Sequence, residues 1–218
     1  MQHVSKSYSE GGFEAHVLRG VSLELARGET TSLIGVSGSG KTTLISLLAG
    51  LMAPESGAVY FDGRALSDLD DAQRARLRGQ RIGVVLQSGN LIPFLTAAEN
   101  VELALELGGG AKRPRARALE LLHEVGLGAR ADHPPRRMSG GEAQRVSVAM
   151  ALANDPDLLL ADEVTGQLDS ASAGRVMEVI LEAWRERGLT VLFVTHNTEL
   201  AARAQRRLRL HDGAVVAA

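Results

Sequence analysis

The stretch GVSGSGKT, at residues 35–42, constrains the fold of this chain more than any other. It follows an apolar run that ends at Ile34 and precedes a helical pattern that begins at Thr43, so it lies between a predicted buried strand and a predicted helix. Glycines at this spacing let the backbone curl until several N–H groups point at one anion, and the helix dipole adds positive charge there. The sequence therefore predicts a phosphate-binding loop in an α/β fold.

We expect this loop to bind the phosphates of a nucleoside triphosphate. Lys41 is expected to neutralise the β- and γ-phosphates, and the hydroxyl of Thr42 to bind Mg²⁺. A flexible glycine turn is the alternative, and it is disfavoured because the lysine and the threonine fall in register with both flanking elements. The residues predicted to bind the nucleotide here are Gly35, Ser37, Gly38, Ser39, Gly40, Lys41, Thr42 and Thr43.

Two adjacent carboxylates, Asp162 and Glu163, end a second apolar run in the stretch LLLADEVTGQLD at residues 158–169. One reading makes them helix caps, because acidic residues are favoured just before a helix. In a parallel sheet, however, the carboxyl ends of strands meet at one edge, where ligands bind. Asp162 is then expected to hold Mg²⁺ through water and Glu163 to orient and deprotonate a water molecule.

Hydrophobic periodicity predicts a mostly parallel α/β sheet at the two ends of the chain. Val21, Leu23 and Leu25 alternate with polar residues and predict a strand that turns at residues 27–28 into a hairpin with the strand TTSLIG. Further strands are predicted at 59–61, 82–86, 157–161, 190–194 and 208–210, and helices at 44–51 and 176–184, the second ending at Gly188. Residues 96–153 have helical patterns without a strand, which indicates an inserted helical subdomain.

The composition excludes several other classes of protein. The chain has 218 residues, which fits one domain, and it has no cysteine, so disulfides and thiolate metal sites are impossible. Its net charge is −2, and the arginines at 74–81 and 203–207 are interpreted as solvated faces of helices, so no nucleic-acid partner is expected. No apolar stretch is long enough to span a bilayer, so we expect a cytosolic protein that another chain holds at the membrane.

The stretch MSGGEAQRV, at residues 138–146, selects one family among the phosphate-loop proteins. It resembles the signature motif of ATP-binding cassette (ABC) ATPases, and it follows the phosphate loop and precedes the acidic strand in the family's order. Taken alone, Ser139 and Glu142 would be the capping residues of an ordinary helix. The resemblance implies that Ser139, Gly140, Gly141 and Glu142 also bind the nucleotide of a partner subunit.

Four further residues match motifs of the same family. Tyr8 matches the aromatic residue that stacks on adenine, although alone it would be interpreted as an edge or core aromatic. Gln87 matches the Q-loop glutamine, which the resemblance implies to contact Mg²⁺ and to take part in catalysis. Asp169 matches the D-loop aspartate. His196 matches the switch histidine, implied to be catalytic with Glu163 and Lys41, although a lone histidine after an apolar strand is more often part of the core.

The resemblance covers essentially the whole chain and implies a P-loop NTPase (RecA-like) core with a mostly parallel sheet, an antiparallel β subdomain and an inserted helical subdomain. The implied boundaries are 1–87 and about 154–218 for the core, and about 88–153 for the helical subdomain. The implied partners are a second copy or a related ABC ATPase, paired head to tail, and a permease that contacts the Q-loop and the helical subdomain. The strand before Tyr8 is expected to be shortened by the start of the chain at Met1.

The form of the motifs is similar to the branch that serves lipoprotein release, macrolide and peptide export, and cell division. Transport is therefore the first hypothesis. The second is a regulatory ATPase that moves no solute, and a more distant third is action on ribosomes or DNA. The chain departs from the branch at Met150, Val164, Gln167 and Asn197, where arginine, proline, asparagine and aspartate are usual. Because none of these removes a group that touches phosphate or water, ATP hydrolysis remains the prediction.

Overall fold

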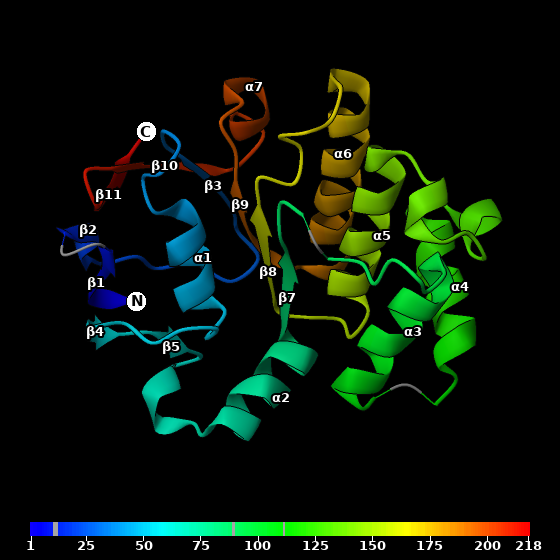
Figure 1. Ribbon diagram of the computed structural model, residues 1–218, viewed down its shortest axis with the longest axis horizontal. Coiled ribbons are helices and arrows are strands. Elements are labelled where there is room, and N and C mark those ends of the chain that lie inside the picture. The colour runs from blue at the N-terminus through cyan, green and yellow to red at the C-terminus, as the bar shows by residue number, and fades with distance from the viewer. Residues whose placement is uncertain (11–12, 89, 111) are drawn as a thin grey trace.

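A six-stranded sheet forms the centre of the computed structural model, which describes residues 1–10, 13–88, 90–110 and 112–218. The strand order is β11-β10-β3-β9-β8-β7, and every neighbouring pair is parallel except β10 and β11 (Figure 1). The strands are β3 (Thr30–Ile34), β7 (Ile82–Val85), β8 (Leu158–Asp162), β9 (Thr190–Val194), β10 (Arg206–His211) and β11 (Ala214–Ala217).

Helices cover both faces of this sheet, which is why its central strands are continuous apolar runs. Side chains of β8 alternate between the two faces. Leu158 and Leu160 pack with α1 (Lys41–Leu48), whereas Leu159 and Ala161 pack with α5 (Gly140–Leu152) and α6 (Ser170–Arg187). Gly188 adopts a left-handed conformation and ends α6 where the sequence predicts it.

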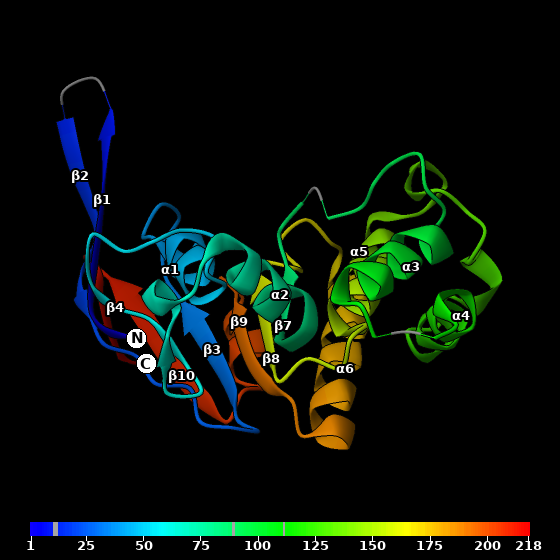
Figure 2. The ribbon, with the colours of Figure 1, turned by 90° about the horizontal axis from the view of Figure 1, so that it is seen from below.

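A smaller antiparallel sheet lies beside the first, with strand order β2-β1-β4. Figure 2 shows that β1 and β2 project from the body of the molecule, at the opposite end from α3 and α4. The strands are β1 (Gln2–Glu10), β2 (Phe13–Val21) and β4 (Ser56–Ala58), and a separate pair is formed by β5 (Tyr60–Phe61) and β6 (Arg64–Ala65).

Helices fill the middle of the chain. They are α2 (Asp71–Arg81), α3 (Ala97–Gly108) and α4 (Pro114–Glu124), followed by α5, with single turns at Leu66–Asp68, Gly128–Arg130 and Pro135–Arg137. Helices α3, α4 and α5 share a core of their own, built on Val101, Leu121 and Val146. Capping boxes at the starts of α2, α3 and α5 satisfy the first free N–H groups of each helix.

The sequence-based prediction was wrong for the strand and hairpin around residues 21–25. Strand β2 ends at Val21, and the N–H of Leu23 instead bonds to the carbonyl of Met1. The hairpin cannot form because both edges of β3 are occupied by parallel partners, β9 and β10. Helix α1 begins at Lys41 rather than Thr43, and the arginines at 206–207 lie in β10 rather than on a helix.

The other predicted elements agree with the structure to within a few residues. The short strands β4, β6 and β11 lack a strong apolar pattern and were not predicted, whereas β1 contains Tyr8 and corresponds to the strand expected there. α7 (Thr198–Ala201) completes the described secondary structure. Among the described residues, no helix combines the length and the hydropathy needed to cross a membrane.

Candidate functional site

The loop between β3 and α1 depends on glycine at its two ends. A Cβ atom at Gly35 would lie 2.7 Å from Ser39 Oγ, and a Cβ at Gly40 would lie 2.5 Å from Val17 Cγ1. Gly38 and Gly40 also have positive φ angles of 77° and 101°. No side chain caps the start of α1, so its first N–H groups remain available to an anion.

Lys41 holds the loop in place from inside. Its side chain is buried, and its ammonium donates to the carbonyls of Gly35 at 3.0 Å and Val36 at 2.9 Å. The ammonium also lies 3.4 Å from a carboxylate oxygen of Glu163. The loop therefore concentrates positive charge and N–H donors around one point, which is the arrangement that binds phosphate.

Asp162 is the last residue of β8, and its carboxylate is buried beside the loop. Its Oδ1 atom has no hydrogen-bond partner among the described residues, and neither does the buried Ser39 Oγ. Burial raises the pKa of Asp162, and the charge of Glu163 raises it further, whereas the side chains of Thr42 and Lys41 oppose the shift. A buried carboxylate with a free oxygen next to a threonine hydroxyl fits a magnesium site.

Glu163 has a left-handed backbone, with a φ of 46°. Non-glycine residues adopt this conformation at a cost of about 1–2 kcal/mol. The N–H of Glu163 is held by the carbonyl of Val194 at 3.1 Å, which supports the unusual conformation. Its carboxylate faces Lys41 on one side and His196 on the other, with His196 Nδ1 4.0 Å away.

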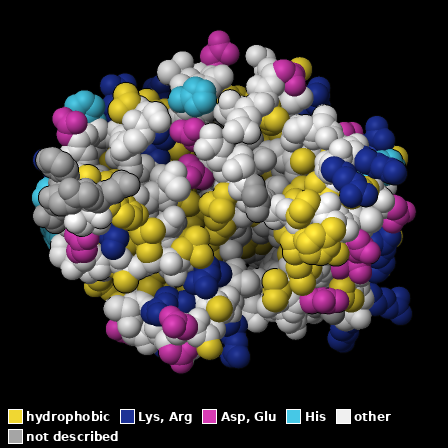
Figure 3. Space-filling model, viewed as in Figure 1, with side chains coloured by type: hydrophobic (Ala, Val, Ile, Leu, Met, Phe, Trp, Pro, Cys, Tyr) yellow, Lys and Arg dark blue, Asp and Glu magenta, His cyan; other side chains and the backbone are white. Residues whose placement is uncertain are grey.

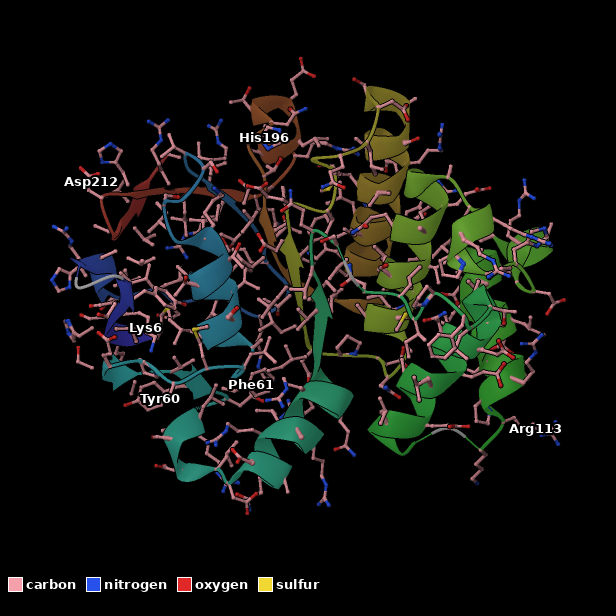
Figure 4. The ribbon with its side chains drawn as sticks, viewed as in Figure 1. Lys6, Tyr60, Phe61, Arg113, His196 and Asp212 are labelled. Atoms are coloured by element: carbon pink, nitrogen blue, oxygen red, sulfur yellow. The ribbon has the colours of Figure 1, made fainter. Side chains whose placement is uncertain are left out.

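His196 lies beside the same carboxylate, and Gln87 lies near the backbone of Glu163 and Gly166. His196 follows β9 and is well exposed, so it is not a core histidine, and Figure 4 shows it near the start of α7. A Cβ atom at Gly166 would lie 3.4 Å from His196 Cε1, 3.4 Å from the carbonyl oxygen of Glu163 and 3.8 Å from Gln87 Nε2. Gly166 was not among the predicted site residues, although the glycine in TGQLD was a visible signal.

Tyr8 lies on β1 next to the start of α1. Its hydroxyl is 3.4 Å from Thr43 Oγ1, and its ring is partly exposed. The ammonium of Lys6, labelled in Figure 4, is 5.9 Å from the centroid of the ring. The tertiary fold therefore places an exposed aromatic face beside the phosphate loop, 35 positions away in the sequence.

The residues from Ser139 to Glu142 begin α5 as a capping box. The Ser139 hydroxyl accepts from the Glu142 N–H at 3.2 Å, and the Glu142 carboxylate accepts from the Ser139 N–H at 2.8 Å. A Cβ atom at Gly141 would lie 2.9 Å from Ser172 Cβ, so α5 and α6 are closely packed here. Asp169 caps α6 by accepting from the N–H groups of Ala171 and Ser172.

The chain thus brings most, but not all, of the predicted site residues together. The phosphate loop, the acidic pair, Gln87 and His196 lie at the carboxyl ends of β3, β7, β8 and β9. The start of α5 lies on the other side of β7 and β8 from α1 (Figure 1). A space-filling view of the same side shows a hollow between these two halves, with apolar side chains along its rim (Figure 3).

A family model described as "ABC transporter" matches residues 18–166. The lipoprotein-releasing system ATP-binding protein LolD 1 of Caulobacter vibrioides is 47% identical over 212 residues, which cover 96% of this chain and 91% of that protein. The ABC transporter ATP-binding protein YbbA of Escherichia coli is 46% identical over 214 residues, covering 98% and 94%.

Solved structures of ATP-binding cassettes are also similar to this chain. One is a dimeric post-hydrolysis state of an ATP-binding cassette bound to ADP and Pi, with a TM-score of 0.91 and 41% identity over 98% of this chain and 94% of that chain. A second dimeric structure of a bacterial ABC transporter cassette has a TM-score of 0.92 and 42% identity with the same coverage.

Proposed function

Because this chain belongs to the ABC transporter family, as one of its ATP-binding proteins, we propose that it hydrolyses ATP at a site shared between two subunits and thereby drives a membrane permease. The observation that carries this proposal is the position of Glu163. Its carboxylate lies between the phosphate-loop lysine and His196, at the carboxyl edge of the parallel sheet.

The phosphate loop binds the triphosphate. The N–H groups at the start of α1 and the ammonium of Lys41 supply positive charge to the β- and γ-phosphates. Tyr8 offers its exposed ring to the adenine base from the neighbouring strand. Gly35, Ser37, Gly38, Ser39, Gly40 and Thr43 complete this half of the site.

Thr42, Asp162 and Gln87 are the residues that fit Mg²⁺. The support for this assignment is the unpartnered Oδ1 of Asp162, buried beside the loop. When bound, Mg²⁺ would neutralise charge on the β- and γ-phosphates. Burial raises the pKa of Asp162 because it disfavours the charged carboxylate, and a bound cation would offset that cost.

Glu163 acts as the general base for water. Its carboxylate lies 3.4 Å from the ammonium of Lys41, and its backbone is left-handed, with a φ of 46°. His196 lies beside the carboxylate, on the side of the site where the γ-phosphate binds. Gln87 reaches the site from the end of β7. General base catalysis of this kind typically contributes about 10²- to 10⁴-fold to the rate.

A second subunit completes the site. Ser139, Gly140, Gly141 and Glu142 lie at the start of α5, on the far side of the sheet from the phosphate loop of the same chain, and Ser139 and Gly140 are exposed there, which supports head-to-tail pairing. Asp169 begins the adjacent helix and faces the same partner. In a two-fold dimer each subunit supplies its signature residues to the nucleotide of the other.

The permease contact involves the segment after Gln87 and the division of the chain into a core (1–87 and about 154–218) and a helical subdomain (about 88–153). Phe94 in this segment is 79% exposed, and the buried amide of Asn100 holds the segment by donating to the carbonyls of Ile92 and Leu95. A rigidly held, exposed aromatic residue suits a docking surface. We place the protein at the cytoplasmic face of the membrane, bound through this surface.

Relatives that match nearly the whole chain support a proposal for the cargo. One of them is named as part of a lipoprotein-releasing system. We therefore propose a permease of the branch that releases lipoproteins or exports peptides and drugs.

Two measurements test the proposed function. ATP turnover per chain, followed by phosphate release, should rise with protein concentration until dimers form, and a constant value across a wide concentration range would contradict a shared site. The chain should also co-purify from its native membrane with an integral membrane protein, and recovery without one would contradict the permease assignment.

A further inference from the structure

A second pocket, of about 540 Å³, lies between the end of α4, α5 and α6. Its lining includes Val125, Arg145, Arg175 and Glu178, and no residue of the phosphate loop or of the acidic pair contributes to it. The lining is mostly apolar apart from its charged groups. The pocket is open to solvent, and its volume lies within the range of small-molecule sites, about 300–1,000 Å³.

Three arginines line this pocket. Arg203 pairs with Glu178, which also lines it, whereas Arg145 and Arg175 lie on different helices and have no such pair. The Nε–H group of Arg145, on α5, donates to the carbonyl of Val125 at 3.1 Å. An NH₂ group of Arg175, on α6, donates to the Ser172 hydroxyl at 3.0 Å. Each guanidinium has five N–H donors in a planar fork, so both retain donors beyond these single bonds.

Neither Arg145 nor Arg175 forms an ion pair within the part of the chain that the structure describes. The nearby carboxylates have other partners, because Glu142 pairs with Arg130 and Glu178 pairs with Arg185 and Arg203. Burial lowers the pKa of Arg145, and the charge of Arg175 lowers it further, although Glu142 opposes the shift. Two like charges therefore face one pocket without a counterion of their own.

We propose that this pocket binds a small anion with an apolar body, a phosphate monoester or a carboxylate, between the guanidinium groups of Arg145 and Arg175. Arginine forks match the geometry of phosphate and carboxylate oxygens and bind them with paired hydrogen bonds. The apolar part of the lining, including Val125 and Val179, receives the body of the ligand.

The bound anion links two helices that begin at functional segments. Helix α5 begins next to Ser139, and α6 begins next to Asp169. An anion between Arg145 and Arg175 cancels their repulsion and holds the two helices together. This consequence rests on the proposed function of those segments, whereas binding itself does not.

The test is calorimetric titration of the intact protein with hexyl phosphate and with inorganic phosphate at constant ionic strength. Five proteins are compared: the wild type, Arg175→Gln, Arg175→Lys, Arg76→Gln and Lys41→Ala. Arg76 lies exposed on α2, far from the pocket lining, so its variant makes the same change of charge elsewhere. Lys41→Ala removes the ammonium group proposed to bind phosphate in the nucleotide loop, which separates binding there from binding in the second pocket.

We expect hexyl phosphate to bind more tightly than inorganic phosphate, because only the former has an apolar body. Arg175→Gln should weaken its affinity about 10- to 100-fold, the loss typical of one charged hydrogen-bonding partner. Arg76→Gln and Lys41→Ala should retain the wild-type affinity. Arg175→Lys, which keeps the charge but loses the fork, should fall between the wild type and Arg175→Gln.

The proposal is overturned by any of three results. They are an absence of hexyl phosphate binding to the wild type, equal affinities for Arg175→Gln and Arg76→Gln, or loss of binding in Lys41→Ala. If Lys41→Ala loses ATP binding and retains hexyl phosphate binding, the two sites are independent. If Arg175→Gln unfolds at a lower temperature than Arg76→Gln, the comparison is made with Arg175→Lys instead.

Discussion

The carboxylate of Glu163 lies 3.4 Å from the ammonium of Lys41, although 122 positions separate the two residues in the sequence. The contact joins the start of α1 to the residue that follows β8. It places the proposed base beside the group proposed to bind the γ-phosphate. The same carboxylate also faces His196, so three elements of the core meet at one side chain.

Replacing Glu163 with glutamine should lower ATP turnover at least about 100-fold, because an amide cannot accept the proton of water. ATP binding should remain, and gel filtration with ATP should show an accumulated dimer. Glu199→Gln makes the same change on the exposed side of α7 and should leave turnover unaltered. Full turnover in Glu163→Gln would contradict the assignment of Glu163 as the general base.

Replacing Lys41 with alanine should weaken ATP binding about 10- to 100-fold, because it removes a buried charged donor from the phosphate loop. Fluorescent-nucleotide titration measures the change. Lys112→Ala, in the turn before α4, is the matched control. An unchanged affinity in Lys41→Ala would contradict the role of the loop.

Mixing two inactive variants should restore activity if pairing is head to tail. Ser139→Arg blocks the signature segment, and Lys41→Ala disables the phosphate loop. A mixed dimer contains one intact site, so an equal mixture should regain about a quarter of the wild-type turnover. Turnover no higher than that of either variant alone would contradict the shared site.

Two glycine substitutions should have opposite effects on stability. A Cβ atom at Gly83 would lie 2.3 Å from the carbonyl oxygen of Ala151, so Gly83→Ala should lower the free energy of unfolding by about 1–3 kcal/mol. A Cβ atom at Gly174, on α6, meets no atom within 4 Å, so Gly174→Ala should raise it by about 0.5–1 kcal/mol. Urea unfolding gives both values, and equal effects would refute the steric argument.

Asp62 should contribute to stability in a pH-dependent way. Hydrogen bonds from Arg27 and Arg81 hold the pKa of Asp62 below its usual value. A carboxylate with a lowered pKa in the folded state stabilises it above the unfolded pKa of about 3.9, and this contribution is lost as the pH falls towards the folded pKa.

Asp62→Asn should therefore lower the free energy of unfolding at pH 7 by less than about 1 kcal/mol, because the pairs are partly exposed. The difference between the variant and the wild type should shrink below about pH 4. A difference that grows on acidification would contradict the assigned charge state.

The sequence alone determined the elements whose signals are local. The GVSGSGKT stretch required a strand before it and a helix after it, and the structure has both. The central strands at 158–162 and 190–194 are continuous apolar runs because both of their faces are buried. Ser139 and Glu142 similarly define a helix start by their spacing.

The short strands β4, β6 and β11 and the pairing around residues 21–25 could not be predicted from local patterns. The alternation of Val21, Leu23 and Leu25 fits a strand, yet the partner required for a hairpin was already paired with two other strands. Strand pairing depends on which edges remain free after the whole sheet has assembled. No local pattern contains that information.

Tertiary structure also decided the directions of the functional side chains. The sequence placed Asp162 and Glu163 side by side, but only the tertiary structure brings the carboxylate of Glu163 next to Lys41, with a left-handed backbone whose N–H bonds to Val194. The facing arginines on α5 and α6 are likewise invisible in sequence, because helix packing sets which side chains share a pocket. Each motif can be recognised from neighbouring residues, whereas the site forms only when long-range packing brings the motifs together.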